Sequence, residues 1–225
     1  MTTQHRFFWG LCRYRTCPVP TWRGWLVLLL AGAALGGVAG RGLHPFLAAH
    51  ESLPGGVLVV EGWMVDYGIE AARAEFGRNH YTQLLVTGGP IDEGAPLCEY
   101  RTFAERGAAI LLRLGMDTNQ VQAVPAPLVA RERTFTSGLS LRAWFQAHPQ
   151  APRKVNLVSQ GAHARRSRLL FQKALGPDTQ VGILAVEDRD YDPAHWWLSS
   201  SGVRTIMSEA ISYVYARFYF NPARE

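Results

Sequence analysis

Apolar positions along the chain follow two alternating spacings from Pro54 onward. Short aliphatic runs at 57–60, 84–87, 121–124, 155–159 and 181–186 have the length and composition of buried strands. Segments with helical spacing at 69–76, 99–114, 134–147, 163–175 and 202–220 follow these runs in turn. Strands that alternate with helices predict a mainly parallel sheet covered on both faces. The expected fold class is therefore α/β, a Rossmann-like three-layer domain over residues 54–220.

A different pattern precedes this domain. Residues 25–40 read WLVLLLAGAALGGVAG, without a charged side chain, and 44–47 extend the apolar segment. This length is near the minimum for crossing roughly 30 Å of hydrocarbon. We interpret 25–47 as an uncleaved signal anchor that forms one transmembrane helix, with a cleaved signal peptide and a buried soluble helix as alternatives. Its Gly-x-x-x-Gly spacings would allow a homo-oligomer to form through this helix.

The distribution of charge predicts on which side of the membrane the domain lies. Residues 1–24 hold Arg6, Arg13, Arg15 and Arg23 and no acidic residue, which is +4 of the formal net charge of +5. A basic tail before an apolar segment predicts a cytoplasmic N-terminus and a domain outside the cytoplasm. Because the excess charge lies in the tail rather than on a folded face, binding to nucleic acid is not expected. The three cysteines lack a zinc-ligand spacing, and no metal site is expected.

Polar residues and glycines follow each predicted strand. The carboxyl ends of parallel strands meet at one edge of a sheet, where ligands bind in open α/β folds. We therefore expect residues that are scattered in the sequence to share one cleft. They are Glu61, Trp63 and Asp66 after the first strand, Gly88 and Gly89 after the second, Arg131, Glu132, Arg133 and Thr134 after the third, Ser159, His163 and Arg166 after the fourth, and 187–190 after the fifth.

The run VNLVSQGAHARRSR at 155–168 is the most specific of these motifs. His163 and three arginines occupy the first turns of a predicted helix, where the helix dipole is already positive and an anion would be stabilising. His163 and Arg166 share a face by their three-residue spacing. Neighbouring cations favour a neutral imidazole, which can act as a general base with Glu61 or Asp66 beside it. Arg165 and Arg168 are expected to face solvent or lipid headgroups.

Two further motifs have both a binding and a structural interpretation. Gly88-Gly89 either lets backbone N–H groups approach a phosphate or only makes a sharp strand exit. Arg133 either forms a bidentate contact with a phosphate or carboxylate or is solvated, and Thr134 is either a ligand contact or a helix N-cap. No dinucleotide fingerprint follows the first strand and no P-loop exists, so the motifs identify no cofactor.

The order of these motifs over roughly 57–218 resembles the SanA/ElyC/YdcF-like family of bacterial envelope proteins. The resemblance is carried by a strand ending at Gly62, a second ending in Thr87-Gly88-Gly89, the helix entry Arg133-Thr134, and the element Val158-Ser159…His163…Arg166. It implies a Rossmann-like periplasmic domain tethered by one N-terminal helix. It also implies a link to envelope integrity, peptidoglycan precursors or the polyprenyl-phosphate carrier.

The sequence thus favours a single-pass protein of the bacterial inner membrane that binds or processes a phosphorylated, lipid-linked or cell-wall precursor. The alternatives are a non-catalytic envelope scaffold or regulator, and a nucleotide or S-adenosylmethionine binder. The expected domains are a cytoplasmic tail at 1–24, the anchor at 25–47 and the periplasmic domain at 54–220. The expected site has His163, Glu61 and Asp66 for proton transfer, and Gly62, Gly88, Gly89, Arg133, Thr134, Ser159 and Arg166 for the ligand.

Overall fold

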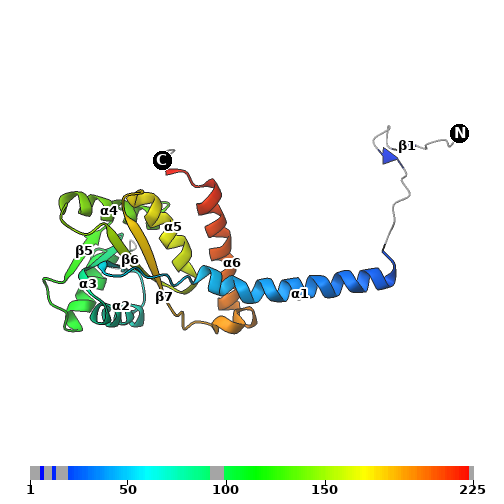
Figure 1. Ribbon diagram of the computed structural model, residues 1–225, viewed down its shortest axis with the longest axis horizontal. Helices are drawn as coiled ribbons and strands as arrows, with labels where there is room; N and C mark the ends of the chain where they lie inside the picture. Colours follow the sequence, from blue (N-terminus) through cyan, green and yellow to red (C-terminus); the bar gives the residue numbers. More distant parts are fainter. Residues whose placement is uncertain (1–5, 8–11, 14–19, 92–98, 223–225) are drawn as a thin grey trace. The chain divides into compact units, whose positions relative to one another are not determined.

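The computed structural model describes residues 6–7, 12–13, 20–91 and 99–222 (Figure 1). The chain forms two compact units, Met1–Gly40 and Arg41–Glu225. The first unit holds a two-residue antiparallel pair, β1 (Arg6–Phe7) and β2 (Cys12–Arg13), and most of the long helix α1 (Trp22–Leu47).

Helix α1 begins three residues before the predicted segment and ends with it. Its 26 residues span roughly 39 Å at 1.5 Å per residue, against about 30 Å of hydrocarbon in a bilayer. None of its most apolar 18-residue window is buried within the structure. Within the described part of the chain, α1 is the one helix long and apolar enough to cross a membrane.

The second unit contains a sheet of five parallel strands. These are β3 (Gly56–Glu61), β4 (Tyr81–Gly88), β5 (Val121–Pro125), β6 (Lys154–Gln160) and β7 (Gln180–Val186), in the spatial order β5-β4-β3-β6-β7. The chain starts at the centre, runs to one edge, and then returns to build the other half. The strand order therefore reverses between β3 and β6, which is where ligands bind in this class of fold.

Helices cover both faces of the sheet, as Figure 1 shows. Helices α2 (Asp66–Arg78) and α3 (Phe103–Arg113) pack on one face, and α4 (Arg133–Ala147) and α5 (Ala164–Leu175) pack on the other. The chain continues through the 3-10 segment η2 (Pro193–Leu198) into α6 (Ser200–Val214) and a π-helical turn, η3 (Tyr215–Tyr219). The predicted α/β class with a parallel sheet is confirmed.

The two faces of β3 belong to two separate apolar cores. Val57 and Val59 pack with the residues of α4 and α5, whereas Leu58 and Val60 pack with those of α2 and α3. Side chains alternate between the faces of a strand. Glu61, the last residue of β3, is therefore directed to the side covered by α5.

The starts of α3, α4 and α5 each differ from the sequence prediction. Helix α3 begins at Phe103 because Thr102 and Glu105 form a capping box, which stops the helix from extending back to 99. Helix α4 begins at Arg133, with Glu132 in the left-handed region (φ 55°) as its N-cap. Thr134 lies inside the first turn, so the N-cap interpretation of Thr134 is wrong. His163 ends a 3-10 turn, η1 (Gly161–His163), and α5 starts one residue later.

Arg165 and Arg168 also differ from expectation, because both contact the segment that connects the apolar run of α1 to the sheet, Arg165 at Phe46 near the end of α1 and Arg168 at Glu51. The Nε of Arg165 donates a hydrogen bond to the carbonyl of Phe46, and its guanidinium lies 4.2 Å from the Phe46 ring centroid. Arg168 pairs with Glu51 and donates to the carbonyl of Val181 at 2.9 Å. These two arginines therefore attach the connecting segment to the domain instead of facing solvent.

Candidate functional site

A cleft of about 1340 Å³ lies at the carboxyl edge of the sheet, where the strand order reverses. It is larger than most small-molecule sites, which have volumes of roughly 300–1000 Å³. Its walls come from the ends of β3, β4 and β6, the segment before α4, the first turn of α4, and α6. The predicted residues that line it are Glu61, Trp63, Gly88, Gly89, Arg131, Glu132, Arg133, Thr134, His163, Arg166 and Asp188.

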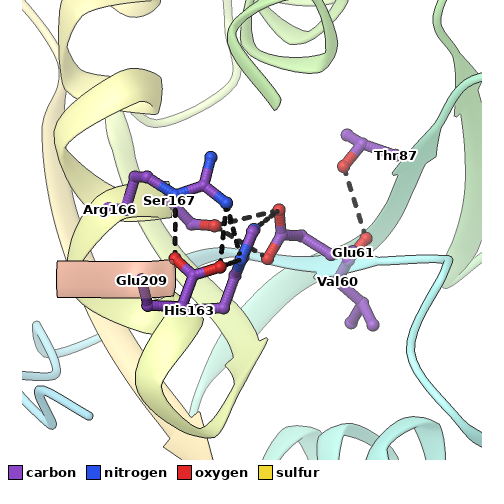
Figure 2. Close-up of polar contacts among 7 residues, drawn as sticks. All are labelled: Val60, Glu61, Thr87, His163, Arg166, Ser167 and Glu209. Carbon is purple, nitrogen blue, oxygen red and sulfur yellow. Dashed lines mark hydrogen bonds and ion pairs between the residues drawn. The ribbon is translucent and has the colours of Figure 1, made fainter. Parts of the chain in front are cut away.

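His163, Arg166 and Glu209 form a closed polar cluster in this cleft (Figure 2). The Nδ1 of His163 lies 3.0 Å from Oε1 of Glu209, which comes from α6. Arg166 donates to both oxygens of the same carboxylate, from Nε at 2.8 Å and from Nη2 at 3.1 Å. The guanidinium is thus held in a bidentate ion pair, a geometry that fixes orientation as well as charge.

The imidazole of His163 has a different environment at each nitrogen. Arg166 Nη2 also lies 3.0 Å from Nδ1, so this nitrogen either accepts from the arginine or donates to Glu209. The other nitrogen, Nε2, is buried and has no hydrogen-bond partner among the described residues. It lies 3.9 Å from Oε1 of Glu61. The proton on Nδ1 therefore decides whether Nε2 is a donor or a free base.

Glu61 is almost fully buried, with 2% of its surface exposed. Both of its carboxylate oxygens accept from the hydroxyl of Ser167, at 3.1 and 3.0 Å. A buried carboxylate is costly unless it is hydrogen-bonded. Ser167 supplies that bond from α5, one turn after His163. Figure 2 shows Glu61 between this hydroxyl and the imidazole.

The cluster changes how its charged members titrate. Burial alone would raise the pKa of Glu209, but hydrogen bonds from His163 and Arg166 outweigh burial and lower this pKa to about 2. Burial opposes the charge on Arg166, yet the bonds and charge of Glu209 leave the pKa of this arginine above its ordinary value. Glu209 is therefore ionised throughout the physiological pH range.

Trp63 and the glycine pair form other parts of the wall. The Trp63 ring meets the His163 ring edge to face, with centroids 5.0 Å apart. A Cβ on Gly88 would lie 2.8 Å from Cβ of Phe103, so the close approach of α3 explains this glycine. A Cβ on Gly89 would have its nearest neighbour 3.8 Å away, and Gly89 therefore leaves room in the cleft rather than relieving a clash.

Arg133 and Thr134 lie across the cleft in the first turn of α4. No side-chain N-cap bond closes this helix end, and the N-terminus of a helix is a position where an anion is stabilised. Arg131 and Arg133 are exposed at the same wall. Among the described lining residues, three arginines stand beside four acids, Glu61, Glu132, Asp188 and Glu209. Arg131 and Arg133 therefore provide the exposed cations of the cleft, whereas Arg166 is paired with Glu209.

Three predicted site residues are not among those that line the cleft. Asp66 turns to α3 and pairs with Arg106 at 2.8 Å. Ser159 is fully buried in β6, and its hydroxyl has no hydrogen-bond partner among the described residues. Gly62 lies against α3, where a Cβ would collide with the carbonyl of Phe103. Of the proposed proton-transfer group, the structure thus brings together His163 and Glu61 but not Asp66.

Sequence reasoning missed Glu209 and Ser167. Glu209 is the single acidic residue in the predicted helix 202–220, an isolated charge that could have marked it. Ser167 lies within the motif at 155–168, but no feature of the sequence around it indicates that its side chain is directed to Glu61.

These features define a class of protein: a Rossmann-like α/β domain with a partly buried Glu-His-Glu-Arg cluster at its switch point, joined to a helix apolar enough to cross a membrane. No protein-family model, curated protein or solved structure matches this chain. Within the described ranges, no group of three or more His, Cys, Asp or Glu side chains is arranged to hold a metal ion.

Proposed function

We propose that this chain is a single-pass protein of the bacterial inner membrane whose periplasmic α/β domain binds and processes a phosphorylated envelope precursor, either polyprenyl-phosphate-linked or related to peptidoglycan. The apolar helix α1 and the basic tail before it support the anchor and its orientation. The motif resemblance supports the link to the envelope. The cleft at the switch point supports ligand binding by the domain.

The observation that carries the proposal is the buried, unpartnered Nε2 of His163, a residue that lines this cleft. Glu209 is ionised and is a strong acceptor, so it favours a proton on Nδ1. Nε2 then has a free lone pair. Glu61, 3.9 Å away, would stabilise the imidazolium that forms when Nε2 takes a proton.

The reaction that this arrangement favours is hydrolysis of a phosphate ester with His163 as general base. A water oxygen forms a bond to phosphorus while one of its protons moves to Nε2. The phosphorus–oxygen ester bond breaks, and the leaving oxygen receives that proton from the imidazolium. Arg133, the first-turn N–H groups of α4 and the backbone at Gly89 would hold the phosphate. Arg166 would position Glu209 and His163.

A binding protein without turnover is the second candidate. It is favoured by the closure of Arg166 on Glu209 and by the burial of Nε2, because structural ion-pair networks have the same appearance. Such a protein would use the same cationic wall and form no product.

The test uses the purified full chain with polyprenyl phosphate and polyprenyl diphosphate. Binding is measured by native mass spectrometry, and turnover by release of inorganic phosphate. The proposal expects Arg133→Ala to weaken binding about tenfold or more, as loss of a charge-assisted contact does. Arg142→Ala, an exposed arginine on the same helix, should bind as the wild type does. His163→Ala should bind without releasing phosphate.

Each result separates the candidates. Binding by the wild type without phosphate release would select the non-catalytic protein. Phosphate release that persists in His163→Ala would show that His163 is not the general base. Failure of the wild type to bind either lipid would reject the proposed ligand class.

A further inference from the structure

Helix α6 and the following turn η3 have two unlike sides. One side packs on the domain, where Ile206 and Ala216 are buried in apolar clusters with residues of other elements. The other side presents large apolar side chains to solvent at spacings of four, four, three and four residues, which place them on one helical face. This apolar face consists of Val203, Met207, Ile211, Val214 and Phe218, with Ile211 67% and Phe218 72% exposed.

The exposed charges on α6 and η3 are of one sign. Arg204 and Arg217 are exposed on the same helix. The single acid of α6 and η3 is Glu209, and its carboxylate is turned into the cleft and paired with Arg166. The exposed side of the helix therefore combines apolar side chains with cations and no acid. This combination is typical of helices that lie in the interface of an anionic membrane.

Helix α6 also packs against the last turns of α1, which follow the apolar run. That run ends at Gly40, and the last turns of α1, from Arg41 to Leu47, belong to the second unit. There the Phe46 ring meets Tyr213 of α6 edge to face at 5.4 Å. Leu43 and Leu47 share an apolar cluster with Ile206 of α6. The residues that contact α6 therefore follow the apolar run of α1 directly in the chain.

Residues before α6 support the same placement. The guanidinium of Arg41 lies 5.6 Å from the ring centroid of Trp197 in η2. The next residue, Leu198, is 76% exposed. Tryptophan and arginine are the residues that gather at the boundary between hydrocarbon and water. The residues just before α6 therefore have the composition that is typical of the boundary between hydrocarbon and water.

We propose that the apolar face of α6 and η3 lies on the lipid surface of the membrane in which α1 is anchored, with Arg204 and Arg217 on anionic phospholipid headgroups. The inference rests on the anchoring part of the proposed function. Soluble proteins seldom expose a continuous apolar strip of this kind without a partner. A bilayer is the partner that fits both the flanking cations and the adjacent end of α1.

This placement narrows the expected ligands of the cleft to phosphate groups carried by lipids. Thr205 and Glu209 line the cleft from the same helix that carries the apolar face. A helix with its side chains is about 10–12 Å across. The cleft wall would therefore lie within about that distance of the lipid surface, within reach of a phosphate headgroup carried by a lipid of the same leaflet.

The test uses the full chain reconstituted in vesicles of phosphatidylcholine and phosphatidylglycerol. A fluorescent amino acid that reports its surroundings replaces Ile211, and a second preparation has it in place of Leu112, an exposed apolar residue of α3. Lipids with a spin label near the top of the acyl chain are then added as quenchers. We expect the emission at 211 to shift to the blue and to fall by roughly half, as burial in the upper acyl region requires. The emission at 112 should not change.

Two readouts separate failure of this inference from failure of the anchor. Flotation of the chain with the vesicles reports the anchor alone. Flotation without quenching at 211 would overturn the inference and leave the anchor intact, whereas loss of flotation would reject the anchor. A dimeric mass in detergent, together with a blue-shifted emission at 211 there, would overturn the inference in favour of a contact between two copies. Replacing both Arg204 and Arg217 by Glu should reduce the quenching at 211. Unchanged quenching would reject the proposed contacts of these two arginines with lipid headgroups.

Discussion

His163 and Glu209 lie 46 positions apart in the chain, and Nδ1 of the histidine lies 3.0 Å from a carboxylate oxygen of the glutamate. The same carboxylate holds both nitrogens of the Arg166 fork. One acidic side chain from α6 thus orients the imidazole and balances the cation of the candidate site. The consequences can be tested on stability and on pH dependence.

Glu209→Gln should make the stability of the domain less dependent on acid. The folded pKa of Glu209, about 2, is below its ordinary value of 4.5. The ionised carboxylate therefore stabilises the fold above pH 4.5, and this contribution is lost as the pH falls toward 2. The difference corresponds to on the order of 3 kcal/mol. Urea unfolding at several pH values should show a decline from pH 4.5 to 2 in the wild type that the variant lacks. Glu70→Gln, an exposed acid on α2, should decline as the wild type does.

Ser167→Ala should destabilise the domain through Glu61. The serine hydroxyl donates to a carboxylate that is 2% exposed, and loss of a hydrogen bond to a buried charge costs about 1.5–3 kcal/mol. Ser208→Ala removes an exposed hydroxyl on α6 and should have little effect on stability. Equal unfolding midpoints for the two variants would mean that Ser167 does not support Glu61.

Gly88→Ala should destabilise the domain, whereas Gly89→Ala should leave its stability unchanged. An added methyl group at Gly88 would lie 2.8 Å from Cβ of Phe103, in a packed contact between β4 and α3. Overpacking of this kind costs about 1–3 kcal/mol. At Gly89 the nearest atom is 3.8 Å away, so Gly89→Ala should fold normally and instead narrow the cleft. Thermal melting distinguishes them, and a stable Gly88→Ala variant would contradict the close packing of α3.

Asn156→Ala should loosen the segment between α1 and the sheet. The buried Asn156 side chain accepts from the N–H of Leu53 at 2.7 Å and donates to the carbonyls of Leu53 and Gly55 at 2.9 and 3.0 Å. Its loss leaves these backbone groups unpaired, at a cost of about 1–3 kcal/mol. Hydrogen exchange should rise in residues 51–55. The exposed Asn119, replaced by Ala, should leave the exchange of this segment as in the wild type.

Much of the site could be predicted because the apolar spacing identifies the strands, and parallel strands end at the same edge of the sheet. Glu61 and His163 follow strands that the apolar spacing predicts, and parallel strands bring their carboxyl ends together. Their proximity therefore follows from the order of elements. The pairing of His163 with Arg166 follows in the same way from helical spacing.

Other features depend on tertiary packing that no spacing shows. The apolar pattern of α6 predicts a helix but not the face that meets α5, so Glu209 could not be matched to His163. Asp66 follows the correct strand, yet it begins α2 and meets Arg106 from α3 instead of the cleft. Thr134 is a residue type that is common at N-caps. The N-cap is instead Glu132, in the left-handed conformation, and the helix begins at Arg133.

The origin of Glu209 in α6 makes the candidate site depend on a segment that follows all five strands of the sheet. A chain that has been synthesised only as far as β7 already contains Glu61 and His163. It lacks the carboxylate that fixes the imidazole and neutralises Arg166 until α6 has docked. The site is therefore complete only once α6 has docked, and a chain truncated before α6 would lack the carboxylate that holds both His163 and Arg166.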